Sequence, residues 1–322
     1  MLKKTLLLTS GLLIIFLSST LTRIDRTPYK ALDFYKKSIH EINQLLTKNP
    51  SRSIGDTLLI GFARANLTPS DLAPLAGYGN RRPKEMTSVH DSIYVNTTVI
   101  NNGKNKIAIV SADLLIIPPE VTALLKEKLF NTGWSLPEIF LSATHTHSSL
   151  GGWAPSLVGN MIAGTYNAKY PEFIANQIIA SIQMAEKRLN AGAWSFNELS
   201  IPSLINNRLV GTQGITDPSL KLMALKSGMQ EGVHVFYGAH ATCLSGENKQ
   251  MSRDYPGVFS DWVVNHTPLD FAVYSAGAVA SMGPETGPKQ GFDRAQFMGE
   301  EMAKQVALIQ QPRSFPSHRR SW

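Results

Sequence analysis

The pattern of apolar and polar positions opens with a long uncharged run. Residues 5–22 are mostly Leu, Ile, Ser and Thr, and Lys3 and Lys4 precede them. Eighteen helical residues would span roughly 27 Å at about 1.5 Å each, the lower limit for crossing a bilayer. We therefore expect residues 1–26 to form a signal anchor or a cleaved signal peptide. An anchor predicts a membrane-bound protein whose remaining chain lies in the periplasm or outside the cell, and a cleaved peptide predicts a secreted one.

The following segment has a helical period. Its apolar positions recur at steps of three and four residues: Leu32, Tyr35, Ile39, Ile42 and Leu46. Thr27 and Pro28 suit an N-cap and a first helical position, so the helix is expected to start there. Residues 49–53 contain Pro and Ser and are expected to be a linker. Residues 27–55 therefore predict an amphipathic stalk helix with its linker.

Beyond residue 55, short β-rich runs alternate with helical patterns. Strands are expected at residues 57–62, 92–100, 106–111, 138–144, 220–226, 233–237 and 271–276. Helices are expected at residues 119–131, 171–189 and 294–310, the last opened by Asp293 and Gln296 in capping-box spacing. This alternation predicts an α/β fold, with residues 56–310 as a single domain in which helices flank a mixed β-sheet. Residues 311–322 are basic, contain two prolines and predict a disordered tail.

Composition and charge narrow the function classes. The 322 residues include 31 Lys and Arg against 24 Asp and Glu, and much of the basic excess lies near the two ends. No basic stretch interleaved with aromatics is present, which argues against nucleic-acid binding, and basic ends fit a membrane surface better. Cys243 is the sole cysteine, so no internal disulfide can form. No phosphate loop, dinucleotide fingerprint or G-x-S-x-G motif occurs, and nothing indicates the oligomeric state.

Two histidines separated by one residue give the strongest chemical signal. His145 and His147 stand in the segment Ser-Ala-Thr-His-Thr-His-Ser-Ser-Leu-Gly-Gly-Trp, directly after a strand pattern. Alternate side chains of an extended chain share a face, so the two imidazoles are expected to point the same way. Neutral imidazole is a ready zinc ligand, and two on one face begin a metal site. Gly151 and Gly152 then allow a sharp turn or a close approach to a substrate.

Three further polar residues stand at strand ends or in loops. His240 follows the strand pattern at 233–237, Asp113 follows the one at 106–111, and Asp254 lies in a loop-like Met-Ser-Arg-Asp-Tyr-Pro-Gly stretch. Active sites of α/β proteins usually form at such positions. Taken singly, each of the three is as consistent with a structural role as with a role in a site.

A series of short motifs resembles one known family. The stretches are residues 61–69, 76–79, 89–91, 111–113, 143–148, 207–208, 240–242 and 252–257. They occur in the order seen in the neutral/alkaline, non-lysosomal ceramidases, and the similarity covers about residues 57–310. That family cuts the amide bond of N-acylsphingosines with one zinc ion. The resemblance implies a ceramidase-like amidohydrolase of linear amides whose partner is an amphiphilic lipid amide.

The resemblance also assigns roles. It implies that His145 and His240 are Zn²⁺ ligands, and that His147 is a catalytic residue that faces the substrate or the attacking water. Arg208 resembles the active-site arginine of the family. Three residues are expected to support the site: His90, Asp113 and Asp254.

The chain departs from the family pattern in three places. Arg253 precedes Asp254 where the family usually has Gly, and residues 276–285 lack the fuller Gly-Asp-Val-Ser-Pro form. The family's other zinc ligands, a glutamate and a tyrosine, come from a region downstream of residue 322, so we expect a truncated or frame-shifted chain. Two alternatives therefore stay open. The chain could be a non-catalytic, membrane-anchored remnant, or a zinc hydrolase of other small amides or esters.

Overall fold

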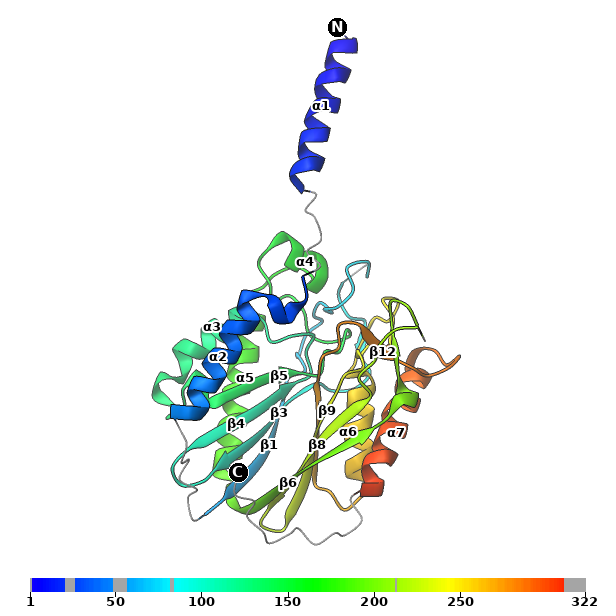
Figure 1. Cartoon of the computed structure of the whole chain (residues 1–322). Coiled ribbons are helices and arrows are strands. Elements are labelled where there is room, and N and C mark those ends of the chain that lie inside the picture. Colours follow the sequence, from blue (N-terminus) through cyan, green and yellow to red (C-terminus); the bar gives the residue numbers. More distant parts are fainter. Residues whose placement is uncertain (1, 21–26, 49–56, 82–83, 212, 310–322) are drawn as a thin grey trace. The chain divides into compact units, whose positions relative to one another are not determined.

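The computed structural model describes residues 2–20, 27–48, 57–81, 84–211 and 213–309 (Figure 1). The chain divides into two units, Met1–Ser53 and Ile54–Trp322. The predicted linker at 49–53 and the predicted tail at 311–322 lie outside the described residues.

The described residues of the first unit form two α-helices. Helix α1 is Leu2–Thr20, and the apolar side chains along its second half, such as Ile14 and Phe16, are exposed. Within the described ranges, none of the helices combines the length and the apolar character that a membrane span requires. The signal anchor, the signal peptide and the export of the protein therefore stay predictions.

The second helix of this unit starts later than the sequence predicts. A 3₁₀ turn, η1 (Tyr29–Ala31), follows Pro28, and α2 is Asp33–Lys48. Leu32 between them is extended, with φ −73° and ψ 145°, which interrupts the helix. The predicted start at Thr27 and Pro28 is thus wrong. Asp33 in the first turn of α2 places a negative charge at the positive end of the helix dipole.

One eight-stranded mixed sheet dominates the described part of the second unit (Figure 1). Its order is β11 (Phe271–Ala276), β9 (Gln230–Tyr237), β8 (Ser219–Ser227), β6 (Asn190–Ser200), β1 (Leu59–Asn66), β3 (Tyr94–Asn101), β4 (Lys106–Ala112) and β5 (Ile139–Ala143). The pairs β11/β9 and β4/β5 are parallel, and the others are antiparallel. Two small ladders join β2 (Ser88–Val89) to β10 (Gln250–Met251) and β7 (Ile205–Asn207) to β12 (Met282–Pro284). The predicted mixed α/β architecture is confirmed.

The sheet curls so that its two edge strands, β5 and β11, come together. Their side chains meet directly, with the hydroxyl oxygens of Ser142 and Ser275 2.7 Å apart. On the concave side, Phe62 of β1 stacks on Phe271 of β11, with ring centroids 5.0 Å apart. Strands that are far apart in the sheet order are therefore close in space.

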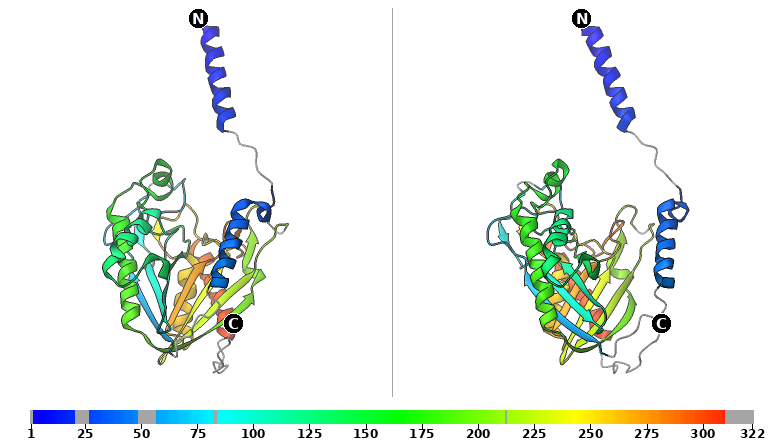
Figure 2. Two further views of the ribbon diagram at one scale, coloured as in Figure 1. Left: turned by 60° about the vertical axis from the view of Figure 1, so that its left-hand side comes forward. Right: turned by 90° about the vertical axis from the view of Figure 1, so that its left-hand side faces the viewer.

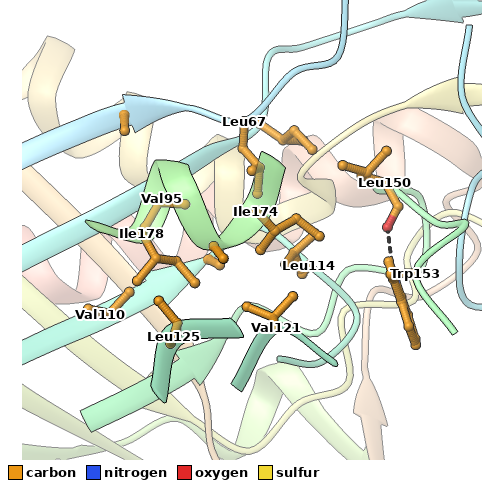
Figure 3. Close-up of a cluster of buried hydrophobic side chains, with 14 of the residues drawn as sticks. Leu67, Val95, Val110, Leu114, Val121, Leu125, Leu150, Trp153, Ile174 and Ile178 are labelled. Carbon is orange, nitrogen blue, oxygen red and sulfur yellow. Dashed lines mark hydrogen bonds between the residues drawn. The ribbon is translucent and has the colours of Figure 1, made fainter. Parts of the chain in front are cut away.

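Helices cover each half of the curled sheet (Figure 2). Helix α5 (Lys169–Lys187) lies against β1 and β3, and α3 (Pro119–Lys128), followed by η2 (Leu129–Asn131), packs beside it. The core between them is drawn in Figure 3, where Ile174 and Ile178 of α5 meet Val95 and Val110 of the sheet. Each such buried side chain contributes roughly 1.5–3 kcal/mol. The helix predicted at 171–189 is thus present, and its Ile174, Ile178 and Ile182 side chains are buried.

The other half of the sheet is covered by α6 (Asp254–His266) and α7 (Gly291–Ile309). Helix α7 begins three residues before the predicted start, so Asp293 lies inside its first turn rather than at a cap. Sequence reasoning missed α6, because Pro256 and Gly257 suggested a loop. Proline is tolerated in a first helical turn, where its missing N–H has no partner to lose. It also missed the short α4 (Leu157–Ala163).

Strand β6 was missed for a different reason. Most of its residues are exposed or half-buried on both faces, so the sequence shows no alternation of apolar and polar positions. Its strand conformation comes from pairing along its length with β8.

Candidate metal centre

Three imidazoles converge at the carboxyl ends of β5 and β9. His145 and His147 follow β5, and His240 follows β9 by three residues. The Nε2 atom of His240 lies 2.8 Å from Nε2 of His145 and 3.0 Å from Nε2 of His147. Within the described residues they form the one cluster of His, Cys, Asp or Glu side chains suited to a metal ion, with ligand atoms within 4.8 Å of one another. The sequence prediction that these residues gather at one point is confirmed.

The sequence predicts that His145 and His147 point the same way as alternate residues of an extended chain, and this reason is wrong. Strand β5 ends at Ala143, and His145 has a positive φ of 62°, so the two histidines are not alternate residues of a strand. Their rings stand nearly perpendicular, at 84°, with centroids 5.0 Å apart. A non-glycine residue in the left-handed region is strained by about 1–3 kcal/mol, and such strain gathers at functional sites. The turn at His145 aims its ring at His240.

Each ring has its other nitrogen against a backbone carbonyl. Nδ1 lies 2.6 Å from Leu115 O in His145, 3.1 Å from Gly77 O in His147 and 3.1 Å from Val279 O in His240. A carbonyl can only accept, so Nδ1 of His145 and Nδ1 of His147 carry the proton and donate it. Nδ1 of His240 also lies 2.7 Å from Arg208 Nη1, which can only donate, so its carbonyl contact does not by itself assign the proton. Nε2 of His145 and Nε2 of His147 therefore present lone pairs towards Nε2 of His240. Holding the second ring nitrogen in this way is how proteins orient metal-binding histidines.

Burial and mutual proximity keep the three rings neutral. Desolvation lowers the pKa of His145, that of His147 to about 3 and that of His240 to about 4. The neighbouring imidazoles contribute for His147 and His240, and the Arg208 charge adds to the effect on all three. Neutral imidazole is the form that binds a metal. Three imidazole nitrogens within 4.8 Å of one another are a donor set that fits a zinc ion.

Arg208 lies beside this group, as the resemblance implied. It follows β7, and its backbone N–H donates to Ser281 O. Its Nη1 is 2.7 Å from Nδ1 and 3.2 Å from Nε2 of His240. The guanidinium therefore brings a permanent positive charge to the edge of the imidazole group.

Two residues that sequence reasoning missed hold His147. Arg81 is almost fully buried and donates to the carbonyls of His147 (2.8 Å), Ala76 and Asn248. Desolvation lowers its pKa to about 10, so it stays charged at neutral pH. The Tyr78 ring packs on the His147 ring at 4.9 Å. Tyr78 lies within the Ala-Gly-Tyr-Gly stretch, which carried the family resemblance but assigned no role to its side chains.

The supporting residues lie outside the imidazole group. His90 stacks on Phe292 and its Nδ1 contacts the Asp91 carboxylate at 2.9 Å. Asp254 is buried, starts α6 with a φ of 58°, and accepts the N–H of Leu244 at 2.9 Å. The predicted loop position of Asp254 is therefore wrong. Its carboxylate ties the segment after His240 to α6.

Arg253 has a defined place. Its guanidinium pairs with Asp91 at 2.9 Å and with Asp261 at 2.5 Å, and its side chain is buried.

The two glycines after the double histidine, Gly151 and Gly152, are packed closely against other parts of the protein. A Cβ on Gly151 would lie 2.1 Å from Ala163 O, and one on Gly152 would lie 2.6 Å from the Tyr170 ring.

Asp113 is expected to make stability depend on pH. Its buried carboxylate accepts the Tyr94 N–H at 2.8 Å, yet desolvation raises its pKa from 3.8 to about 6. The folded state then binds this proton more tightly than the unfolded state, so the contribution of Asp113 to stability falls as pH rises from about 4 to about 6. Asp113→Asn keeps an acceptor and removes the titration. Relative to wild type, the variant should gain about 2–3 kcal/mol between pH 4 and pH 7 in urea unfolding. A difference that does not change with pH would contradict this.

Comparisons with known proteins show the family and the fold. The family model of neutral/alkaline non-lysosomal ceramidase, N-terminal, matches residues 58–267, and the chain belongs to this family. A neutral ceramidase from Pseudomonas aeruginosa is 24% identical over 230 residues, which cover 66% of this chain and 34% of that protein. The chain thus spans about a third of the length of this curated relative.

Two solved structures share the fold. One is a ceramidase complexed with C2, and the other is the neutral ceramidase from Pseudomonas aeruginosa. Each has a TM-score of 0.70 and 20% identity over 78% of this chain, and the aligned part covers 43% and 44% of the two proteins.

Proposed function

We propose that this chain carries the first part of the active site of a zinc-dependent hydrolase that cleaves the amide bond of ceramide-like N-acyl lipids. The observation that carries the proposal is the convergence of three neutral imidazoles, each oriented by a backbone carbonyl, within 4.8 Å. Family membership supplies the reaction class, because relatives of this chain are named neutral ceramidases.

His145 and His240 would hold the ion through Nε2. When bound, a zinc ion would polarise the amide carbonyl and lower the pKa of a bound water towards about 7. Catalytic zinc sites usually have about three protein ligands and an open position for water. Two assignments of His147 satisfy the geometry. It is either the third ligand or the group that transfers a proton, and the family resemblance favours the second.

The chain's own residues suit the remaining tasks of amide hydrolysis. His147 keeps its Nδ1 proton against Gly77 O, so its Nε2 atom is the one that would accept a proton and pass it to the leaving amine. The Arg208 guanidinium, beside His240, would bind and orient an oxygen of the substrate's polar head. If residues 1–26 anchor the protein, the domain would meet its lipid substrate at a membrane surface outside the cytoplasm.

Metal content and turnover test this proposal together. The purified full chain should bind about one zinc ion per molecule, as measured by elemental analysis. If the chain is active without further segments, it should also release fatty acid from N-acylsphingosine. A chain that retains no zinc and no turnover would remove the proposal. Turnover of short acyl amides or esters with none of N-acylsphingosine would favour a different zinc hydrolase.

His147→Ala separates the two assignments of this residue. If His147 transfers a proton, the variant keeps its zinc and loses about 10²–10⁴-fold in turnover, the usual contribution of general acid–base catalysis. Zinc titration with a competing chelator is the measurement. Loss of the metal from His147→Ala would instead identify a third ligand.

A further inference from the structure

The two proposed zinc ligands come from opposite ends of the sheet. His145 follows β5, which is one edge, and His240 follows β9, the neighbour of the other edge strand, β11. Five strands lie between β5 and β9 along the sheet order. Small changes of twist at each strand pair would add up across the sheet. The separation of the two rings is therefore set more directly by contacts between the two edges of the sheet.

A chain of side-chain hydrogen bonds crosses the gap between the edges. His234 Nε2 lies 2.7 Å from Ser275 Oγ, Ser275 Oγ lies 2.7 Å from Ser142 Oγ, and Ser142 donates to Val110 O at 2.8 Å. Because Ser142 gives its one proton to a carbonyl, Ser275 donates to Ser142 and His234 donates to Ser275. The hydrogen bonds of this series are therefore all donated in one direction, from β9 through β11 to β5. We call these residues, with Ser111, the seam.

Ser111 adds a second link between the same edges. It is fully buried on β4 and donates to the backbone carbonyl of Tyr274 on β11 at 2.6 Å. His234 is fully buried, and desolvation lowers its pKa to about 3, so its ring is neutral. Its Nδ1 has no hydrogen-bond partner among the described residues, which costs stability, and the bond from Nε2 to Ser275 offsets part of that cost.

Strand β11 also holds the segment that leads into His240. The Tyr274 hydroxyl lies 3.0 Å from Tyr237 O and 3.3 Å from Ala239 O. The Tyr255 hydroxyl of α6 donates to Ala239 O at 2.5 Å. One strand therefore fixes β5 through its serine and the approach to His240 through its tyrosine.

We propose that Ser142 and Ser275 are positioning residues that set the separation of the His145 and His240 rings. This inference rests on the proposed function, because a fixed separation of the two rings matters for binding a metal ion. The seam acts at short range, because only Ala143 and Thr144 lie between Ser142 and His145. Outer contacts of metal ligands typically change affinity 10- to 100-fold.

The chain offers a matched control for an effect on stability alone. Ser181 of α5 is fully buried and its Oγ lies 2.6 Å from Thr97 Oγ1 of β3. Ser181→Ala removes a hydroxyl pair of similar length from the other face of the sheet. Because Ser181 is fully buried and Ser142 is half-buried, it should lower the melting temperature at least as much as Ser142→Ala does, without touching the seam.

The test compares the zinc affinity of four full-length variants. Ser142→Ala and Ser275→Ala are expected to raise the zinc Kd about 10-fold or more, while Ser181→Ala stays within about twofold of wild type. Ser142→Thr retains the hydroxyl and should bind zinc like wild type. Equal affinities in Ser142→Ala, Ser275→Ala and Ser181→Ala would overturn the inference.

A second measurement does not need the metal. Ring-nitrogen NMR spectra of the metal-free protein report the tautomer and surroundings of His145 and His240. Both signals should shift in the two seam variants and stay in place in Ser181→Ala. If wild type binds no zinc, the proposed function fails, and these spectra still test whether the seam positions the two rings. Unchanged His145 and His240 signals would then overturn it.

Discussion

Replacing His240 by alanine is expected to abolish zinc binding and activity together. His240 Nε2 is the atom common to both short contacts of the imidazole group. A metal acting as a Lewis acid contributes several kcal/mol, and each 1.4 kcal/mol is about tenfold, so turnover should fall on the order of 10³-fold or more. His145→Ala should behave in the same way. Elemental analysis and fatty-acid release measure the two effects.

The same variant has a diagnostic effect on stability. Zinc that binds only the folded state raises the melting temperature of wild type, and His240→Ala should lose that increment. The melting temperature of the variant should therefore be the same with and without zinc. His90→Ala is the control, since this ring stacks on Phe292 outside the group. A similar loss of zinc in His90→Ala would contradict the assignment.

Gly77→Ala is expected to displace His147 and destabilise the domain. Gly77 has a φ of 120°, which a side chain rarely tolerates, and its carbonyl orients the His147 ring. A Cβ at this position would lie 2.6 Å from both Cα and Cβ of His147. Backbone strain alone should cost about 1–3 kcal/mol in chemical unfolding, and the clash adds to it.

Gly79→Ala is the matched control two residues away. A Cβ there meets nothing within 4 Å, and its φ lies outside the left-handed region. It should leave both stability and turnover close to wild type. If Gly77→Ala were as mild as Gly79→Ala, the close packing of the 77–79 turn on His147 would not be important for the site.

The contacts of Arg253 explain one departure from the family pattern. Arg253 stands where the family usually has glycine, and it occupies its place by pairing with Asp91 and Asp261. Removing either carboxylate would leave the buried Arg253 guanidinium with one partner fewer, at a cost in stability.

The sequence by itself determined the class of fold and the identity of the imidazole group. Seven strands and three helices follow from apolar periodicity, because a strand or helix with one buried face shows its period in the residues. His145 and His147 could be singled out because they stand two residues apart directly after a strand pattern, whereas His240 was assigned to the site by the family resemblance. Strand β6 could not be predicted in this way, because both of its faces are largely exposed.

Only the tertiary structure decided how the site is oriented and held. The positive φ of His145 and the carbonyls of Leu115, Gly77 and Val279 that fix each ring come from segments far apart in sequence. Hydrogen bonds of this kind have no signature in spacing or composition. The meeting of β5 with β11 likewise depends on the curl of the whole sheet. Which histidines take part could be predicted from the sequence, but the way they face one another is a property of the folded chain.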